Sequence, residues 1–122
     1  MWYGWGPAES GFRWSDESEA SVVFAVSKVN QTRLRISLAP YLAEGHIPRQ
    51  RLGLSLNGQS LATWNLKNEG FNEYDVPIPK GVLQQQNILK FDLPDADSPR
   101  HFRLSPDQRL LGVSVQFISF EP

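Results

Sequence analysis

Residues 51–66 read RLGLSLNGQSLATWNL, and this stretch decides the fold. Up to Leu56 its leucines occupy every second position, which is the period of a half-buried β-strand. The pair Asn57-Gly58 then offers the two positive-φ residues that a type I′ turn requires. Apolar residues resume from Leu61 to Leu66, so the stretch predicts a tight antiparallel hairpin.

The same alternation recurs along most of the chain. In TRLRISLAP, residues 32–40, the leucines and the isoleucine share one face and the arginines take the other. Further strands are predicted at residues 20–28, 73–78, 88–93 and 111–120. The segment VPIP contains Pro77 and Pro79, which lack backbone donors, so the strand at 73–78 is expected at a sheet edge.

The predicted fold class is all-β. No window keeps a 3.6-residue period, so helix is limited to single turns, at residues 79–86 and at Ser105-Pro106-Asp107. About eight strands with frequent turn signals predict an antiparallel β-sandwich, jelly-roll-like, with at most a short helical turn. The 122 residues form a single domain, residues 1–122. The abrupt start, just before the GWG turn, predicts a domain excised from a longer protein, with Met1 added.

Composition excludes several classes of partner. The net charge is −1 and the pI about 6.1, with no basic run, so neither nucleic acid nor an anionic membrane surface is favoured. No apolar stretch approaches the length of a membrane span, so no membrane contact is expected from this segment. The absence of cysteine excludes disulfides, thiolate metal sites and a cysteine nucleophile.

No catalytic or metal-binding constellation emerges. His46 and His101 are far apart, lie in no HxH, HExxH or GxSxG pattern, and are expected to be exposed loop residues. The carboxylates Asp95 and Asp97 lack the glycine and glutamate of an EF-hand loop and fall in a polar turn. The chain is therefore predicted not to be an enzyme and to need no metal or cofactor. A small glycosidase, which needs two converging carboxylates, is the least favoured alternative.

Aromatic residues crowd the opening MWYGWGPAESGFRWS, residues 1–15. By alternation Phe12 and Trp14 share one face, which predicts a strand that anchors the core, while Arg13 takes the other face. Three further aromatics lie among glycines and are predicted to be free to stack on a ligand. These candidates are Trp2, Tyr3 and Trp5.

Charged residues from the two ends of the chain form a second set of candidates. Terminal strands of a sandwich are often neighbours, so Glu9 and Arg13 are expected to lie near Asp107 and Arg109. One reading is a structural lock of arginine–carboxylate pairs, which is favoured because buried arginines are normally paired. The other is a ligand-binding group beside Trp2 or Trp5.

Four motifs, taken in their order along the chain, resemble those of a known family. They are GWGPAESGFRWS (residues 4–15), the Asn-Gly hairpin, DADSP (95–99) and SPDQRLLG (105–112). Together they resemble a family of small jelly-roll accessory domains attached to bacterial glycosyltransferases and other cell-surface polysaccharide biosynthesis proteins, similar in shape to carbohydrate-binding modules. The likeness covers nearly the whole chain.

The resemblance implies a non-catalytic, glycan-binding accessory module of a bacterial protein. Its partners would be a glycan and the other domains of the parent protein, and the parent would decide between cytoplasm and cell envelope. The alternative is a structural or protein-interaction domain that positions a partner enzyme without binding glycan. In that case the opening aromatics would form an apolar patch against the partner.

Overall fold

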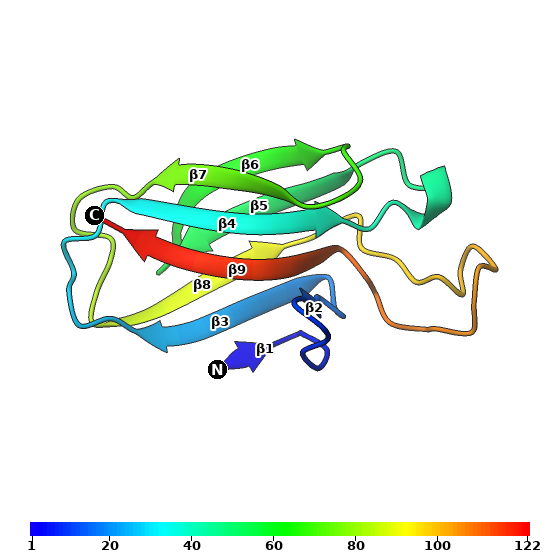
Figure 1. Ribbon diagram of the computed structural model, residues 1–122, viewed down its shortest axis with the longest axis horizontal. Coiled ribbons are helices and arrows are strands. Elements are labelled where there is room, and N and C mark those ends of the chain that lie inside the picture. The colour runs from blue at the N-terminus through cyan, green and yellow to red at the C-terminus, as the bar shows by residue number, and fades with distance from the viewer.

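The computed structural model describes residues 1–122, which form two antiparallel sheets packed face to face (Figure 1). The strands are β1 (Trp2–Tyr3), β2 (Arg13–Trp14), β3 (Glu19–Ala25), β4 (Arg33–Pro40), β5 (Gln50–Leu56), β6 (Gln59–Leu66), β7 (Asn72–Pro77), β8 (Gln86–Asp92) and β9 (Val113–Glu121). One sheet has the order β1-β3-β8-β5-β6 and the other β2-β9-β4-β7. The predicted all-β, jelly-roll-like sandwich is confirmed, with nine strands, two of them only two residues long.

The path of the chain explains how distant segments become neighbours. From β3 to β9 every connection crosses from one sheet to the other, except the hairpin between β5 and β6. Consequently β9, the last strand, lies between β2 and β4, and its Val115 and Ser114 pair with Arg13 and Trp14. The two ends of the chain meet, as the sequence predicted.

The hairpin forms as its turn residues dictate. Asn57 and Gly58 have φ values of 52° and 84°, the positive values that a type I′ turn needs. The Asn57 amide also binds the neighbouring strand: its Oδ1 accepts from the Ile88 N–H at 2.8 Å, and its Nδ2 donates to the Val82 carbonyl at 2.8 Å. The turn is therefore fixed to β8 as well as to its own strands.

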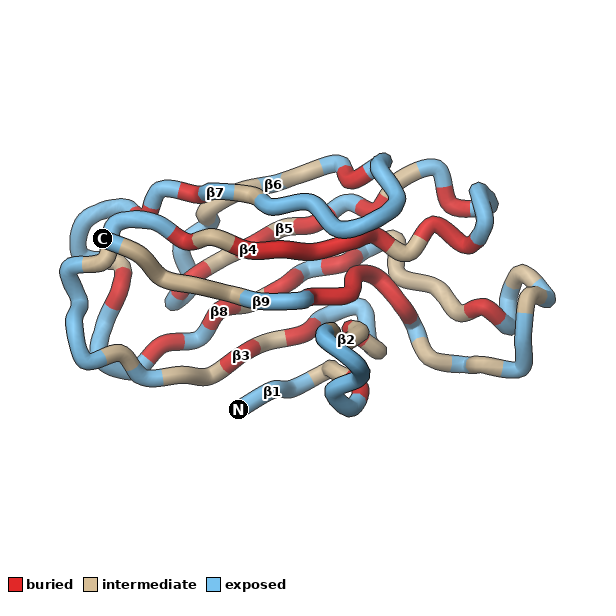
Figure 2. Tube along the Cα trace, viewed as in Figure 1, coloured by how far each residue is buried: buried red, intermediate tan, exposed pale blue.

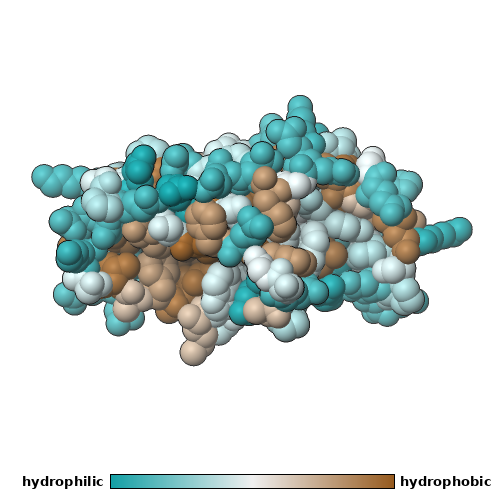
Figure 3. Space-filling model, viewed as in Figure 1, coloured by the Kyte–Doolittle hydropathy of each residue, from teal (hydrophilic) through white to brown (hydrophobic).

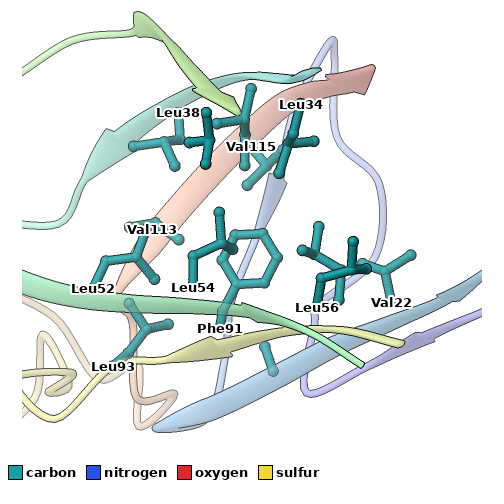
Figure 4. Close-up of a cluster of buried hydrophobic side chains, with 14 of the residues drawn as sticks. Val22, Leu34, Leu38, Leu52, Leu54, Leu56, Phe91, Leu93, Val113 and Val115 are labelled. Atoms are coloured by element: carbon teal, nitrogen blue, oxygen red, sulfur yellow. The ribbon is translucent and has the colours of Figure 1, made fainter. Parts of the chain in front are cut away.

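The core lies between the sheets and follows the alternation of the strands (Figure 2). Figure 4 shows Leu34 and Leu38 of β4 on one side of it, facing Leu52 and Leu54 of β5 on the other. Phe91 of β8 fills the centre and is fully buried. Because these side chains come from strands of both sheets, the core joins the two layers.

Two local predictions are wrong. Residues 79–86 form a turn closed by the Val82 N–H on the Pro79 carbonyl at 3.2 Å, with no helix, because Gly81 takes a positive φ of 84°. No helix starts at Ser105 either: its Oγ accepts from the Asp107 N–H at 3.2 Å, but the Asp107 carboxylate then accepts from the Arg109 N–H at 3.0 Å, a local turn that competes with a helix. The edge position of β7 is confirmed.

The helical content is a single 3₁₀ turn, η1 (Ala43–Gly45), between β4 and β5. It is irregular, because Ala43 and Glu44 have positive φ values of 49° and 54°. No helix in the structure has the length and apolar character needed to cross a membrane.

Candidate ligand-binding site

Strand β1 places Trp2 at the surface, and Trp5, two residues beyond the strand, packs beneath Trp2. The Trp2 side chain is exposed, and the guanidinium carbon of Arg13 lies 4.8 Å from the centre of its ring. Trp5 packs edge-on against Trp2 at 5.3 Å and against Phe91 of the core at 5.1 Å. Its indole N–H donates to the Ser21 carbonyl at 3.2 Å. Trp5 is thus a half-buried support rather than the free stacking residue that the sequence predicted, whereas Tyr3 is 52% exposed.

The predicted charged residues assemble only in part. Arg109 and Asp107 form a pair within one loop, with Nη2 and Oδ2 at 2.8 Å, and these bonds lower the pKa of Asp107 and raise that of Arg109. Arg13 donates to the Gly6 carbonyl at 3.2 Å. The Arg109 side chain also approaches Gly6, 3.3 Å from where a Cβ would lie. Glu9 makes no ion pair, so no arginine–carboxylate fork joins the two ends.

Ser15 instead forms the junction between the two ends of the chain. The side chain is fully buried, and its Oγ accepts hydrogen bonds from the N–H groups of Gly112 at 3.1 Å and Val113 at 2.9 Å. The Leu110 N–H donates to the Asp16 carbonyl nearby at 3.3 Å. Backbone groups and one hydroxyl therefore tie the chain ends together, and the charges of Glu9 and Asp16 act on Arg109 without forming an ion pair.

Phe12 and Trp14 lie outside the core, which corrects the prediction that they anchor it. Both are half-buried, and neither belongs to the core cluster. Trp14 pairs with Ser114, whose own partner across β9 and β4 is Ala39. Successive side chains of a strand point to opposite faces, and Val113 points into the core. Ser114 and its partners Trp14 and Ala39 therefore lie on the outer face of the four-stranded sheet. The alternation was correctly recognised, but the wrong face was assigned to the interior.

A cleft of about 320 Å³ opens on this outer face. Its floor is made of small residues, Ala39 and Ser114, and its aromatic walls come from the segment around β2 and from the β4–β5 and β6–β7 loops. The residues that define this aromatic cleft are Phe12, Trp14, Tyr41 and Phe71, with the carboxylates Glu44 and Glu69. The cover explains why the second half of β4 is buried on both faces.

The four rings form a continuous chain of contacts. Phe12 lies 6.0 Å from Phe71 and 6.3 Å from Trp14, and Trp14 lies 6.0 Å from Tyr41. The Phe12–Trp14 and Trp14–Tyr41 pairs meet at nearly right angles, which is a favoured geometry for aromatic pairs. The rings therefore hold one another in place while Phe71 remains exposed.

The charged residues in and around the cleft are negative. Burial raises the pKa of Tyr41, and the charges of Asp107, Glu44 and Asp97 raise it further. The Tyr41 hydroxyl is buried and has no hydrogen-bond partner. Glu44 and Glu69 are exposed and form neither an ion pair nor a hydrogen bond. No lysine, arginine or histidine lines the cleft.

Two other hollows are less suited to a polar ligand. One of about 470 Å³ lies at the opposite end of the sandwich, where residues 29–32 meet residues 78–83, and it has no aromatic residue. Another, of about 420 Å³, runs between β3 and β9, where the short β1 and β2 leave both strands partly uncovered. This side groove is lined mainly by Met1, Trp2, Phe24, Phe117, Ile118 and Phe120. Figure 3 shows apolar surface there, at the lower left.

The histidines and the aspartates of the DADSP motif are engaged in local contacts. His101 Nδ1 lies 2.7 Å from Asp97 Oδ2, and the His46 ring stacks on Phe102 at 5.3 Å. Arg51 binds both oxygens of Asp95, at 2.9 and 2.7 Å, which lowers the pKa of that carboxyl. No three His, Cys, Asp or Glu side chains gather as a metal site.

The sequence did not indicate four residues of the cleft: Tyr41, Glu44, Glu69 and Phe71. Two signals were available: a Glu-Gly pair occurs in each of the two loops, at residues 44–45 and 69–70, and both glycines have positive φ. Each pair marks a sharp turn beside an aromatic residue. Sequence alone gave no means of knowing that the two loops flank Trp14.

The sequence matches no protein-family model and no curated protein. Among solved structures, the chain is similar to the C-terminal domain of EclA, a sugar-binding protein, with 8% identity, a TM-score of 0.53, and coverage of 83% of this chain and 64% of that one. It is also similar to a family 35 carbohydrate-binding module from an environmental isolate, with 11% identity, a TM-score of 0.54, and coverage of 85% and 65%.

A third similarity is to a family two carbohydrate esterase from Clostridium thermocellum, with 10% identity and a TM-score of 0.56. It covers 98% of this chain but only 30% of the esterase. The chain thus spans less than two thirds of the length of each of these three proteins. At such identities the likeness concerns the fold, and the chain has the β-sandwich fold found in carbohydrate-binding modules.

Proposed function

We propose that this chain is a non-catalytic carbohydrate-binding module and that the aromatic cleft is its glycan site. The observation that carries the proposal is the gathering of four aromatic rings from three separate segments of the chain above a floor of Ala39 and Ser114. The presence of carbohydrate-binding modules among the structural neighbours supports it.

The cleft has the two kinds of surface that a sugar needs. The apolar C–H face of a pyranose packs against aromatic rings such as Trp14 and Phe71, and its hydroxyl groups donate to carboxylates such as Glu44 and Glu69. The volume of about 320 Å³ is within the range of small-ligand sites and suits one or two sugar units. The site is open, so longer chains can continue beyond it.

The test is a titration with diverse bacterial and plant oligosaccharides, followed by NMR. A ligand should shift the indole signal of Trp14 and the backbone signals of residues 69–71. Phe71→Ala should weaken binding by about two- to tenfold, because the packing of an aromatic ring contributes about 0.5–1.5 kcal/mol. Tyr3→Ala is the matched control, because it removes an exposed aromatic outside the cleft.

The residues predicted from sequence remain a second proposal. Trp2 and Tyr3 would offer the stacking surface, with Trp5 as support and Arg13 over the Trp2 ring. The charged residues Glu9, Asp107 and Arg109 would complete that surface. Trp2→Ala decides between the two sites: unchanged affinity assigns the ligand to the cleft, and lost affinity assigns it to the N-terminal surface.

The wider setting that we propose is an accessory module of a larger bacterial protein that makes surface polysaccharide. Its partners would be a glycan and the other domains of that protein, and the compartment would follow from the parent. The resemblance of the motifs supports this setting. Sequencing the complete reading frame tests it, and a parent without any carbohydrate-active domain would contradict it.

The side groove favours a second function, that of a structural domain that positions a partner enzyme. An apolar hollow that includes the exposed Phe117 suits a protein contact better than a sugar. In this case Phe117→Glu should abolish association with the rest of the parent polypeptide, as measured by light scattering. Intact association in that variant would refute the structural function.

A further inference from the structure

We propose that the aromatic cleft selects glycans that carry a positively charged amino group, such as oligosaccharides of de-N-acetylated hexosamine. The inference rests on the proposed glycan-binding function and names the ligand class of the same site. It follows from the charge that lines the cleft and from the absence of any compensating cation.

The free carboxylates are the first support. Glu44 and Glu69 line the cleft from two different loops, η1 and the segment before β7. Other carboxylates nearby are neutralised: Asp95 by Arg51 and Asp107 by Arg109. Glu44 and Glu69 have no such partner, so their charge is available to a ligand.

The second support is the sign of the charges around Tyr41, which lines the cleft. The charges of Asp107, Glu44 and Asp97 all act on the Tyr41 hydroxyl in the same sense, and they raise its pKa in addition to the effect of burial. Glu44 comes from the loop between β4 and β5, and Asp97 and Asp107 come from the loop between β8 and β9. Asp107 is paired with Arg109 and Asp97 lies beside His101, so Glu44 is the one of the three whose charge a positively charged ligand can use.

The aromatic walls favour the same ligand. An ammonium group near the face of a tryptophan or tyrosine ring is attracted by the negative face of the ring. Trp14 and Tyr41 already pack edge to face at 6.0 Å, so an ammonium group can use only the ring faces that this contact leaves open to the cleft. A uronic acid would gain nothing from these rings by its charge and would be repelled by Glu44 and Glu69.

The experiment compares three oligosaccharides of equal length by NMR titration: a chito-oligosaccharide, its fully de-N-acetylated counterpart and an oligogalacturonate. We expect the de-N-acetylated ligand to bind tightest, with shifts at Trp14 and residues 69–71, and the oligogalacturonate not to bind. Glu44→Gln and Glu69→Gln should each weaken that binding by about two- to fivefold, as solvent-exposed charge pairs do. Raising the salt concentration should weaken it too.

Matched controls separate charge selection from general attraction. Glu17→Gln removes an exposed carboxylate that does not line the cleft, and it should leave every affinity unchanged. The acetylated ligand lacks the charge, and a glutamine oxygen still accepts from sugar hydroxyls, so Glu44→Gln and Glu69→Gln should weaken its binding less than that of the de-N-acetylated ligand. Thermal unfolding of each variant shows that the fold is retained.

The outcomes separate the two proposals. Equal or tighter binding of the acetylated ligand or the oligogalacturonate in the cleft would overturn the charge selection and leave the glycan site standing. The charge selection would also be overturned if the de-N-acetylated ligand bound tightly and its affinity did not change with Glu44→Gln, with Glu69→Gln or with added salt. If none of the three ligands, nor any in the wider panel, shifts a cleft residue, the proposed function itself fails.

Discussion

Ser15 and Val113 hold the two ends of the chain together through a reciprocal pair of hydrogen bonds. The Ser15 N–H donates to the Val113 carbonyl at 2.8 Å, and the Val113 N–H donates to Ser15 Oγ at 2.9 Å. Both residues are fully buried, so neither group has water as a substitute partner. The walls of the cleft depend on this junction, because Trp14 and Ser114 are the adjacent residues.

The first prediction concerns that hydroxyl. Ser15→Ala should lower the free energy of unfolding by about 2–4 kcal/mol, because it leaves the buried N–H groups of Gly112 and Val113 without this acceptor. Urea denaturation measures the change. Ser10→Ala, at an exposed loop position, is the control and should have little effect. An equally small loss in both variants would show that the junction contributes nothing to stability.

Trp5 should behave as a structural residue. Trp5→Ala should lower the free energy of unfolding by about 2 kcal/mol, because the ring packs on Phe91 and is half-buried. Tyr3→Ala, which removes an exposed ring from the same segment, should cost much less. Chemical denaturation of both variants makes the comparison, and a stable Trp5→Ala protein would return Trp5 to the candidate ligand residues.

The hairpin turn should be sensitive to its asparagine. Asn57→Ala should destabilise the protein by about 2–3 kcal/mol, because it removes hydrogen bonds to Val82 and Ile88 and leaves alanine at a positive φ of 52°. Asn68→Ala, in an exposed loop, is the matched control for the loss of an amide. Thermal unfolding that does not distinguish the two variants would contradict this account of the turn.

The Tyr41 hydroxyl should contribute nothing to folding. It is buried without a hydrogen-bond partner, so Tyr41→Phe should keep the free energy of unfolding or raise it by about 1 kcal/mol. The ring contact with Trp14 is unaffected by this change. A loss of stability in urea denaturation would reveal a partner for the hydroxyl. Tyr74→Phe, another half-buried tyrosine, provides the comparison.

Acid should destabilise the loop between β8 and β9. The arginine partners lower the pKa of Asp95 and Asp107 in the folded protein below the ordinary 3.8. A depressed carboxyl pKa stabilises the fold above the unfolded pKa, and that stabilisation is lost as pH falls through the folded pKa. Stability should therefore decline below about pH 4, and Asp95→Asn should show a smaller decline.

The control for the acid effect is Asp92→Asn, which removes an exposed carboxylate that forms no ion pair. Denaturation midpoints measured between pH 6 and pH 3 give the comparison. Identical pH dependence in Asp95→Asn and the unaltered protein would show that the Arg51–Asp95 pair does not stabilise the fold.

Local signals in the sequence predicted much of the fold. The Asn57-Gly58 turn has a conformation that few other pairs adopt, and the alternation in β4 leaves one register for its leucines. Both features are set by neighbours in the chain. For the same reason the prolines of the VPIP segment correctly indicated an edge strand.

The cleft required information that no local pattern contains. Alternation says that Phe12 and Trp14 share a face, but it does not say whether that face meets the core or the solvent. Strand β2 has only two residues, so its orientation follows from its pairing with β9. Tyr41 and Phe71 reach Trp14 only because the chain crosses between the sheets, which brings together segments distant in sequence.

The position of β9 has a consequence for synthesis in the cell. This strand is made last among the nine, yet it lies inside its sheet, between β2 and β4. Until residues 113–121 have left the ribosome, β2 has no strand to pair with. The core beside β4 also lacks the side chains of Val113 and Val115, which belong to β9. A nascent chain can close the hairpin early, but the four-stranded sheet and its aromatic cleft assemble only when translation of this segment is complete.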